Sequence, residues 1–325
     1  MSKKELFSLF LGILLTFFLC FVSLNSVFAQ ENQVGLTITP LTFEISANPG
    51  TAIENKVEVL NPTKNTINVS MEIEDFTALG EEGAVAVGEQ ENKIYSLKRW
   101  VTTTPKVFTL APGANKVVTF RVDIPENAEP GGKYATILAS VTGISGPKQS
   151  GATINPKVGS LLLVSVSGEI KEDIKVKGFS VPSLISQGPV PLVLRLLNEG
   201  TVHEKPNGLI TVTDIFGRQI AKIEIPQKNV LPGAVRKIEA QLKNKWLWGI
   251  RYRATFSGSY GSQNTPLTAS VDFWAFPWQI AIPVFVVLII VIWFIAKTSK
   301  KIKKAEEILK EKEKESEREP PKKIV

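Results

Sequence analysis

Few residues in this chain have the chemistry or the spacing of a catalytic or metal-binding site. His203 is the only histidine and Cys20 the only cysteine among 325 residues, whereas a zinc site or a Cys–His pair needs several such groups close together. His203 lies in the turn-like stretch NEGTVHEKPNG, where we expect a solvated loop residue. The glycines lack the strand-to-helix context of a phosphate loop, no G-x-S-x-G sequence occurs, and the carboxylates are scattered. We therefore predict no catalytic residue, no metal, no cofactor and no enzymatic activity.

The candidates for ligand binding are two tryptophans in the stretch KNKWLWGIRY. Trp246 and Trp248 form a dense aromatic pair outside the apolar segments described below. Such a pair suits an exposed patch for a glycan or a partner protein. The favoured alternative is a lid over the core of a β-sandwich, because aromatic side chains dominate such cores.

An uninterrupted apolar segment near the C-terminus sets the organisation of the chain. Residues 275–296, AFPWQIAIPVFVVLIIVIWFIA, contain no ionisable side chain. As a helix they extend about 33 Å, enough to cross a hydrocarbon core of roughly 30 Å. The aromatic and basic flanks favour a transmembrane helix over a buried core helix or a strand pair. Membrane-interface anchors are predicted at Trp274, Trp278, Trp293, Lys297, Lys300 and Lys301.

The N-terminal region has the pattern of an export signal. Lys3 and Lys4 precede an apolar run over residues 6–22, and Val27-Phe28-Ala29 then suits cleavage between Ala29 and Gln30. We predict a signal peptide over residues 1–29, with an uncleaved membrane anchor as the alternative. Both interpretations place residues 30–273 outside the cytoplasm and the basic tail, residues 297–325, inside it.

Composition limits the class of the exported part. The chain is 43% hydrophobic and 21% charged, which is typical of globular proteins and leaves room for two domains. Its net charge of +7 is concentrated in residues 297–325, where eleven Lys and Arg accompany seven Glu. The outer part is nearly balanced, so we predict no nucleic-acid partner. Because the predicted mature chain has no cysteine, it must fold without disulfides, which favours a bacterial or archaeal origin.

The sequence of the outer part predicts antiparallel β-structure throughout. Short runs rich in Val, Ile, Thr and Phe alternate with polar residues and are separated by Gly, Pro and Asn clusters. Pro40 predicts a sheet edge or a strand that switches sheets. Residues 77–94 lose the alternation and predict a mobile surface loop. Tyr134, near the start of a strand, predicts a buried ring whose hydroxyl bonds nearby backbone, and the apolar run over residues 161–164 predicts a closing strand buried between layers.

Three short motifs recur in the same order in the two halves of the outer part. LNP at residue 60 corresponds to LNE at 197, LAPGANKVV at 110 to LPGAVRKIE at 231, and GKYAT at 132 to IRYRAT at 250. Turn motifs recur widely, so chance similarity is the alternative. The favoured fold class is all-β, with two tandem immunoglobulin-like β-sandwich domains and one C-terminal transmembrane helix. The predicted domains are residues 30–170, which carry the inserted loop 77–94, and residues 171–274.

The overall plan resembles the bacterial WxL-interacting protein family. The resemblance lies in LTITPLTFEISANPGTAIENKVEVLNPTKNTINVSMEIEDF in the first half, and in LPGAVRKIE and WGIRYRATFSGSYG in the second, and it covers most of residues 33–296. It implies two sandwiches, one associated with peptidoglycan and one with a surface protein, and it supplies no binding residues. The first half also looks like the sandwich of pilus chaperones.

These observations predict a single-pass cell-membrane protein with extracytoplasmic β-sandwich domains. The leading hypothesis is a bacterial cell-surface binding or adhesion protein that engages a cell-wall polymer or another exported protein through an edge strand or a loop face. A membrane-tethered pilus-type assembly chaperone and a passive envelope stalk are the alternatives. The sequence leaves the oligomeric state open.

Overall fold

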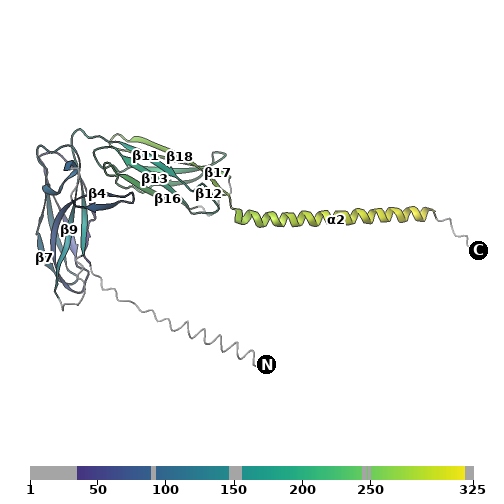
Figure 1. Ribbon diagram of the computed structural model, residues 1–325, viewed down its shortest axis with the longest axis horizontal. Helices are drawn as coiled ribbons and strands as arrows, with labels where there is room; N and C mark the ends of the chain where they lie inside the picture. The colour runs from purple at the N-terminus through teal and green to yellow at the C-terminus, as the bar shows by residue number, and fades with distance from the viewer. Residues whose placement is uncertain (1–34, 89–92, 146–155, 244–246, 248–249, 319–325) are drawn as a thin grey trace, which may run out of the picture.

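The computed structural model describes residues 35–88, 93–145, 156–243, 247 and 250–318. The predicted signal peptide with its cleavage site at Ala29 and Gln30 lies outside the described residues, and so do Trp246 and Trp248. The described chain is mostly β-structure followed by one long helix (Figure 1). Its strands form four sheets that surround two separate hydrophobic cores.

The first two sheets are built from strands that lie between residues 37 and 166, and two short 3-10 turns lie between two of these strands in the sequence. One sheet has the order β1 (Thr37–Thr39), β3 (Ala52–Leu60), β8 (Asn115–Asp123) and β6 (Val101–Thr104). The other has the order β2 (Thr42–Ala47), β10 (Lys157–Val166), β9 (Gly131–Ser145), β4 (Thr66–Leu79) and β5 (Ala84–Val87), and β7 (Val107–Leu110) also pairs with β4. The 3-10 turns are η1 (Lys93–Tyr95) and η2 (Lys98–Trp100).

The other two sheets are built from residues 174–275. One has the order β11 (Ile174–Ser180), β13 (Val190–Asn198) and β16 (Val235–Leu242). The second has the order β12 (Leu184–Ile185), β18 (Thr265–Ala275), β17 (Arg251–Tyr260), β14 (Asn207–Asp214) and β15 (Gln219–Glu224). We call the two pairs of sheets the first and the second sandwich.

The strand order of the first sandwich is that of an immunoglobulin-like fold, in which the first, second, fifth and fourth strands form one sheet and the third, sixth and seventh form the other. Pro40 lies where the first strand crosses between the sheets, because β1 pairs with β3 and β2 pairs with β10. The predicted strand switch is confirmed. The second sandwich repeats the crossing, since β11 pairs with β13 and β12 with β18.

Alternating apolar residues form the core face of β4. Ile67, Val69 and Met71 are buried between the sheets, and Ile73 packs against the same core. Residues 161–164 are covered on both faces of their sheet. Leu162 joins this core, whereas Leu163 joins a small separate cluster on the outer face. The continuous apolar run is therefore explained by burial on both sides.

The prediction of a mobile loop over residues 77–94 is wrong for most of the described part of that range. Residues 77–79 belong to β4, and β5 pairs with them to form a hairpin. The alternation of Ala84-Val85-Ala86-Val87 supports this strand, and the turn before it uses Gly80 and Gly83 at positive φ. The hairpin projects from the first sandwich toward the second (Figure 1).

The C-terminal helix, α2 (Trp278–Arg318), begins three residues later than the predicted span. Residue 275 still belongs to β18, so only Phe276 and Pro277 separate the strand from the helix. Within α2, residues 278–300 form the one stretch of the described chain that is long and apolar enough to cross a membrane. The helix continues into the basic tail as far as Arg318, just before the prolines at 320 and 321.

Candidate functional site

The first sandwich lies across one end of the second, and the β4–β5 hairpin bridges the corner between them (Figure 1). The backbone N–H of Lys237, on the edge strand β16, donates to the carbonyl of Glu81 at 2.8 Å. The side chain of Glu81 accepts from Arg195 Nε at 2.6 Å, and Glu82 pairs with Lys237 Nζ at 2.9 Å. The hairpin tip therefore binds the second sandwich through both backbone and side chains.

A second contact between the sandwiches surrounds Tyr134. This ring is buried, but its hydroxyl lies 3.3 Å from Nδ1 of His203 in the second sandwich. The hydroxyl therefore makes a contact across the interface, and the predicted bond to nearby backbone stays a prediction. The expectation of a solvated His203 is wrong, because the imidazole is half-buried against the Tyr134 ring. Burial lowers the pKa of His203 to about 4, so the ring is neutral at physiological pH.

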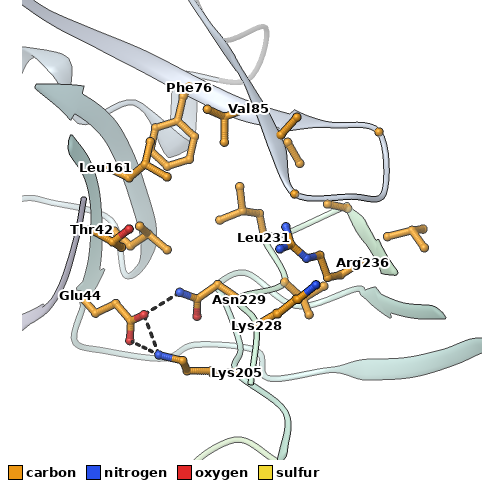
Figure 2. Close-up of a pocket in the computed structure, with 18 of the residues that line it drawn as sticks. Thr42, Glu44, Phe76, Val85, Leu161, Lys205, Lys228, Asn229, Leu231 and Arg236 are labelled. Atoms are coloured by element: carbon orange, nitrogen blue, oxygen red, sulfur yellow. Dashed lines mark hydrogen bonds and ion pairs between the residues drawn. The ribbon is translucent and has the colours of Figure 1, made fainter. Parts of the chain in front are cut away.

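Between these contacts lies a cleft of about 420 Å³, which is within the roughly 300–1,000 Å³ range of ligand pockets. One wall belongs to the first sandwich, and the other to the second sandwich, mainly the loop between β15 and β16 and the start of β16. Figure 2 shows this cleft with the hairpin above it. Its lining residues are Thr42, Glu44, Phe76, Ala78, Gly80, Gly83, Ala84, Val85, Leu161, Leu163, Lys205, Gln227, Lys228, Asn229, Val230, Leu231, Ala234, Val235 and Arg236.

The floor of the cleft is apolar and is shared by both sandwiches. Phe76 and Leu163 are buried there beside Tyr134, and Val85 and Leu231 pack against them. Leu231 comes from the second sandwich and points toward Phe76 and Val85 of the first (Figure 2). This cluster is distinct from both main cores. It leaves an apolar surface facing the cavity.

One rim of the cleft is an ion pair with an amide beside it. Lys205 Nζ lies 3.0 Å from Oε1 of Glu44, and Asn229 donates to the same oxygen at 2.7 Å (Figure 2). Burial alone would raise the pKa of Glu44, but the hydrogen bonds from Asn229 and Lys205 lower it overall. Glu44 is therefore ionised, and Lys205 balances its charge.

The rest of the rim is cationic and incompletely satisfied. No described carboxylate forms a salt bridge with Lys228 or Arg236. The buried atoms Arg236 Nε and Asn229 Oδ1 have no hydrogen-bond partner among the described residues. The guanidinium of Arg236 lies over Gly83, in the space that a β-carbon there would occupy. Buried polar groups are normally paired. The cleft thus offers a positive group, a free donor and a free acceptor next to an apolar floor.

The free edge of a strand runs beside the cleft. β2 is the end strand of its sheet, and its residues Thr42 and Glu44 line the cavity. Among the described strands, only β10 pairs with it. An end strand presents unpaired backbone groups to which an extended peptide can add.

The predicted membrane-interface residues, which are the predicted site residues that the structure describes, lie away from this cleft. Trp274 is exposed at the end of β18, Trp278 begins α2, and Trp293 lies within α2 with Lys297 Nζ 4.7 Å from its ring centre. Lys300 and Lys301 belong to α2. Membrane contact at these positions stays a prediction. Among the described residues, no three His, Cys, Asp or Glu side chains cluster as metal ligands do.

Sequence reasoning missed the residues of the cleft and of the hairpin tip. The clearest signal was the unbroken apolar run over residues 161–164, whose second face had to be buried outside the main core. The alternation over residues 84–87 was a weaker signal. Leu231 and Arg236 lie in the repeated motif LPGAVRKIE, but nothing in that motif marked them as binding residues.

No family model and no curated protein matches this chain. Solved structures with some similarity include the class 5 fimbriae chaperone CfaA, with a TM-score of 0.38 and 12% identity over 73% of this chain and 98% of that one. The CsuC–CsuE chaperone–tip adhesion subunit complex of Acinetobacter baumannii gives a TM-score of 0.33 and 14% identity, over 74% and 98% of the two chains. The Pseudomonas aeruginosa CupB2 chaperone gives 0.33 and 10%, over 72% and 98%. These values are too low to transfer a function.

Proposed function

We propose that this protein is a membrane-anchored extracytoplasmic binding protein that holds a segment of another exported protein in the cleft between two immunoglobulin-like domains. The observation that carries the proposal is the composition of the cleft. An apolar floor shared by the two sandwiches lies beside unpaired Arg236 Nε and Asn229 Oδ1 and next to the open edge of β2. In this proposal, α2 crosses the membrane once, with the sandwiches outside the cytoplasm.

The chemistry of the cleft suits a polypeptide with neighbouring apolar and acidic side chains. In this proposal, the partner's apolar side chain contacts Phe76, Val85 and Leu231. Its negatively charged acidic group reaches Lys228 and Arg236, whose positive charges complement it. The unpaired amide oxygen of Asn229 accepts a backbone N–H, and the edge of β2 supplies further backbone pairing. The partner's chemistry is thus an extended acidic and apolar segment.

The proposed partner can be tested with a matched pair of substitutions. Leu231→Asp places a carboxylate on the apolar floor, whereas Val117→Asp alters an exposed position on β8, outside the cleft lining. Full-length variants are crosslinked in the cells that make the protein, and their exported partners are quantified by mass spectrometry. Leu231→Asp should lose exported partners that Val117→Asp keeps. Equal recovery from both variants contradicts binding in the cleft.

The proposed orientation has its own test. A cysteine replacing Gln263, in the exposed turn between β17 and β18, should react with an impermeant maleimide in intact cells. A cysteine replacing Thr298 in α2 should react only after the membrane is permeabilised. The reverse pattern contradicts the proposed orientation.

Binding to a cell-wall polymer, and membership of the WxL-interacting family, stay predictions from the sequence. The aromatic candidates for a glycan site, Trp246 and Trp248, lie outside the described residues. The acidic and apolar preference of the cleft favours the protein partner.

A further inference from the structure

The exposed large apolar side chains of the second sandwich gather at one end of it. Among the described residues from 171 to 277, they are Leu184, Ile215, Phe216, Ile250, Trp274 and Phe276. We call this set the basal rim. The strand register places the basal rim at one end of the sheet. Asp214 at the end of β14 is opposite Tyr252. Arg251 and Leu184, from the strands on either side of β18, are both opposite Trp274. Helix α2 leaves the sandwich at this same end (Figure 1).

The junction between the sandwich and the helix is short and hydrogen-bonded. Two residues separate β18 from α2. The backbone N–H of Phe276 donates to the carbonyl of Ile185 at 2.8 Å, and the side chain of Gln279, in the first turn of α2, donates to Ser186 Oγ at 3.1 Å. The helix start is therefore tied to the segment that carries Leu184, so the basal rim stays next to the point where the helix begins.

The β14–β15 hairpin holds the most exposed member of the rim in place. Asp214 Oδ1 accepts from the backbone N–H groups of Phe216 and Arg218, both at 2.9 Å. Phe216 is 75% exposed, and the Arg218 guanidinium lies 5.4 Å from the centre of its ring. An aromatic ring with a basic group beside it suits the boundary between headgroups and acyl chains, where one end of a side chain is apolar and the other is wet.

We infer that the basal rim rests in the headgroup layer of the leaflet that α2 enters, so its partner is a phospholipid surface. The inference rests on the proposed membrane anchoring. Trp274 is four residues from Trp278, a span of at most about 14 Å when extended, so the rim begins within reach of the interface. Contiguous exposed apolar surface commonly marks an interaction site. The consequence is that the second sandwich stands at a fixed height and orientation, with the cleft at its far end.

Spin-label accessibility in vesicles tests this inference. Full-length protein with Cys20→Ser receives one nitroxide at a time, through Phe216→Cys, Gln263→Cys or Leu288→Cys, and is reconstituted into phosphatidylcholine and phosphatidylglycerol vesicles. Gln263 lies in the exposed turn at the opposite end of the same sheet as Phe216. We expect collisions with an aqueous nickel chelate to be several-fold fewer at position 216 than at 263, and collisions with oxygen to be more frequent.

Two outcomes overturn the inference in distinguishable ways. Equal nickel accessibility at positions 216 and 263, with position 288 protected, shows that the helix spans the bilayer while the rim stays in water. Nickel accessibility at position 288 contradicts the membrane anchoring itself, and with it the contact of the rim.

Discussion

Arg195 Nε lies 2.6 Å from Glu81 Oε2, which joins the tip of a hairpin in the first sandwich to strand β13 of the second across 114 positions of sequence. Both side chains are partly exposed, so this salt bridge is worth about 0–1 kcal/mol. Its importance is geometric. Together with the bonds of Lys237 to Glu81 and Glu82, it holds the hairpin over the cleft.

Removing this bridge should loosen the angle between the sandwiches without unfolding either one. In Glu81→Ala, the distance distribution between spin labels at positions 117 and 263 should broaden, because the tip keeps only its backbone bond and the Glu82 pair. The melting temperature should stay within a few degrees of the wild type. Glu54→Ala, which removes an exposed bridge to Arg121 inside the first sandwich, is the control and should leave the distribution unchanged. An unaltered distribution in Glu81→Ala contradicts the bridging role of the hairpin tip.

Gly83 and Gly80 form a matched pair for testing the position of Arg236. Both have positive φ, so alanine at either costs about 1 kcal/mol of stability. Only at Gly83 does the new β-carbon meet the Arg236 guanidinium, which is the mobile end of a side chain and must move away. Gly83→Ala and Gly80→Ala should therefore melt alike, while only Gly83→Ala reduces recovery of the exported partner. Equal partner recovery would show that Arg236 does not contribute to binding.

Asn61 and Asn198 should each be critical for the stability of their own sandwich. Asn61 Nδ2 donates to the carbonyls of Leu110 and Ala111, and Asn198 Nδ2 donates to the carbonyls of Val202 and Val230. Both asparagines are fully buried, so their replacement leaves backbone groups unpaired. Asn61→Ala and Asn198→Ala should each cost about 2–3 kcal/mol.

Urea unfolding of the full chain in detergent measures these costs. The control is Asn207→Ala, which removes one exposed hydrogen bond with Ser259 and should change stability by less than about 0.5 kcal/mol. A cost at Asn61 or Asn198 no larger than at Asn207 contradicts the role assigned to the buried amides.

Two neighbouring groups at the interface should give opposite dependences of stability on pH. Burial, reinforced by Glu172, raises the pKa of Glu204 to about 7. The stability that Glu204 contributes to the folded state is therefore complete below its ordinary pKa of 4.5 and is lost as the pH rises through about 7. Burial lowers the pKa of His203 to about 4. The stability that His203 contributes is therefore complete above pH 6.5, its ordinary pKa, and is lost as the pH falls through about 4. The two effects oppose each other between these limits.

Glu204→Gln separates the two effects. The glutamine still accepts the 3.1 Å bond from the backbone N–H of Gly261 but cannot ionise. Its melting temperature relative to the wild type should rise between pH 5 and pH 8. A difference that does not change with pH would show that Glu204 titrates normally.

The sequence predicted the parts of this fold that depend on local pattern. Pro40 indicated the strand switch because proline cannot donate to a ladder, and the repeated LN motifs predicted matching positions at Asn61 and Asn198. The residue pattern failed at residues 77–94, where the hairpin strand is short and is stabilised by contacts with the other sandwich. The cleft was beyond prediction, because Leu231 meets Phe76 only once the two sandwiches are placed together.

The most direct test of binding in the cleft is site-specific photo-crosslinking in intact cells. A photoreactive amino acid at position 231, on the cleft floor, is compared with the same amino acid at position 117, outside the cleft lining on β8. We expect a discrete adduct with an exported protein from position 231, absent from position 117 and lost when Arg236→Ala is added. No adduct from position 231, or the same adducts from both positions, would contradict it.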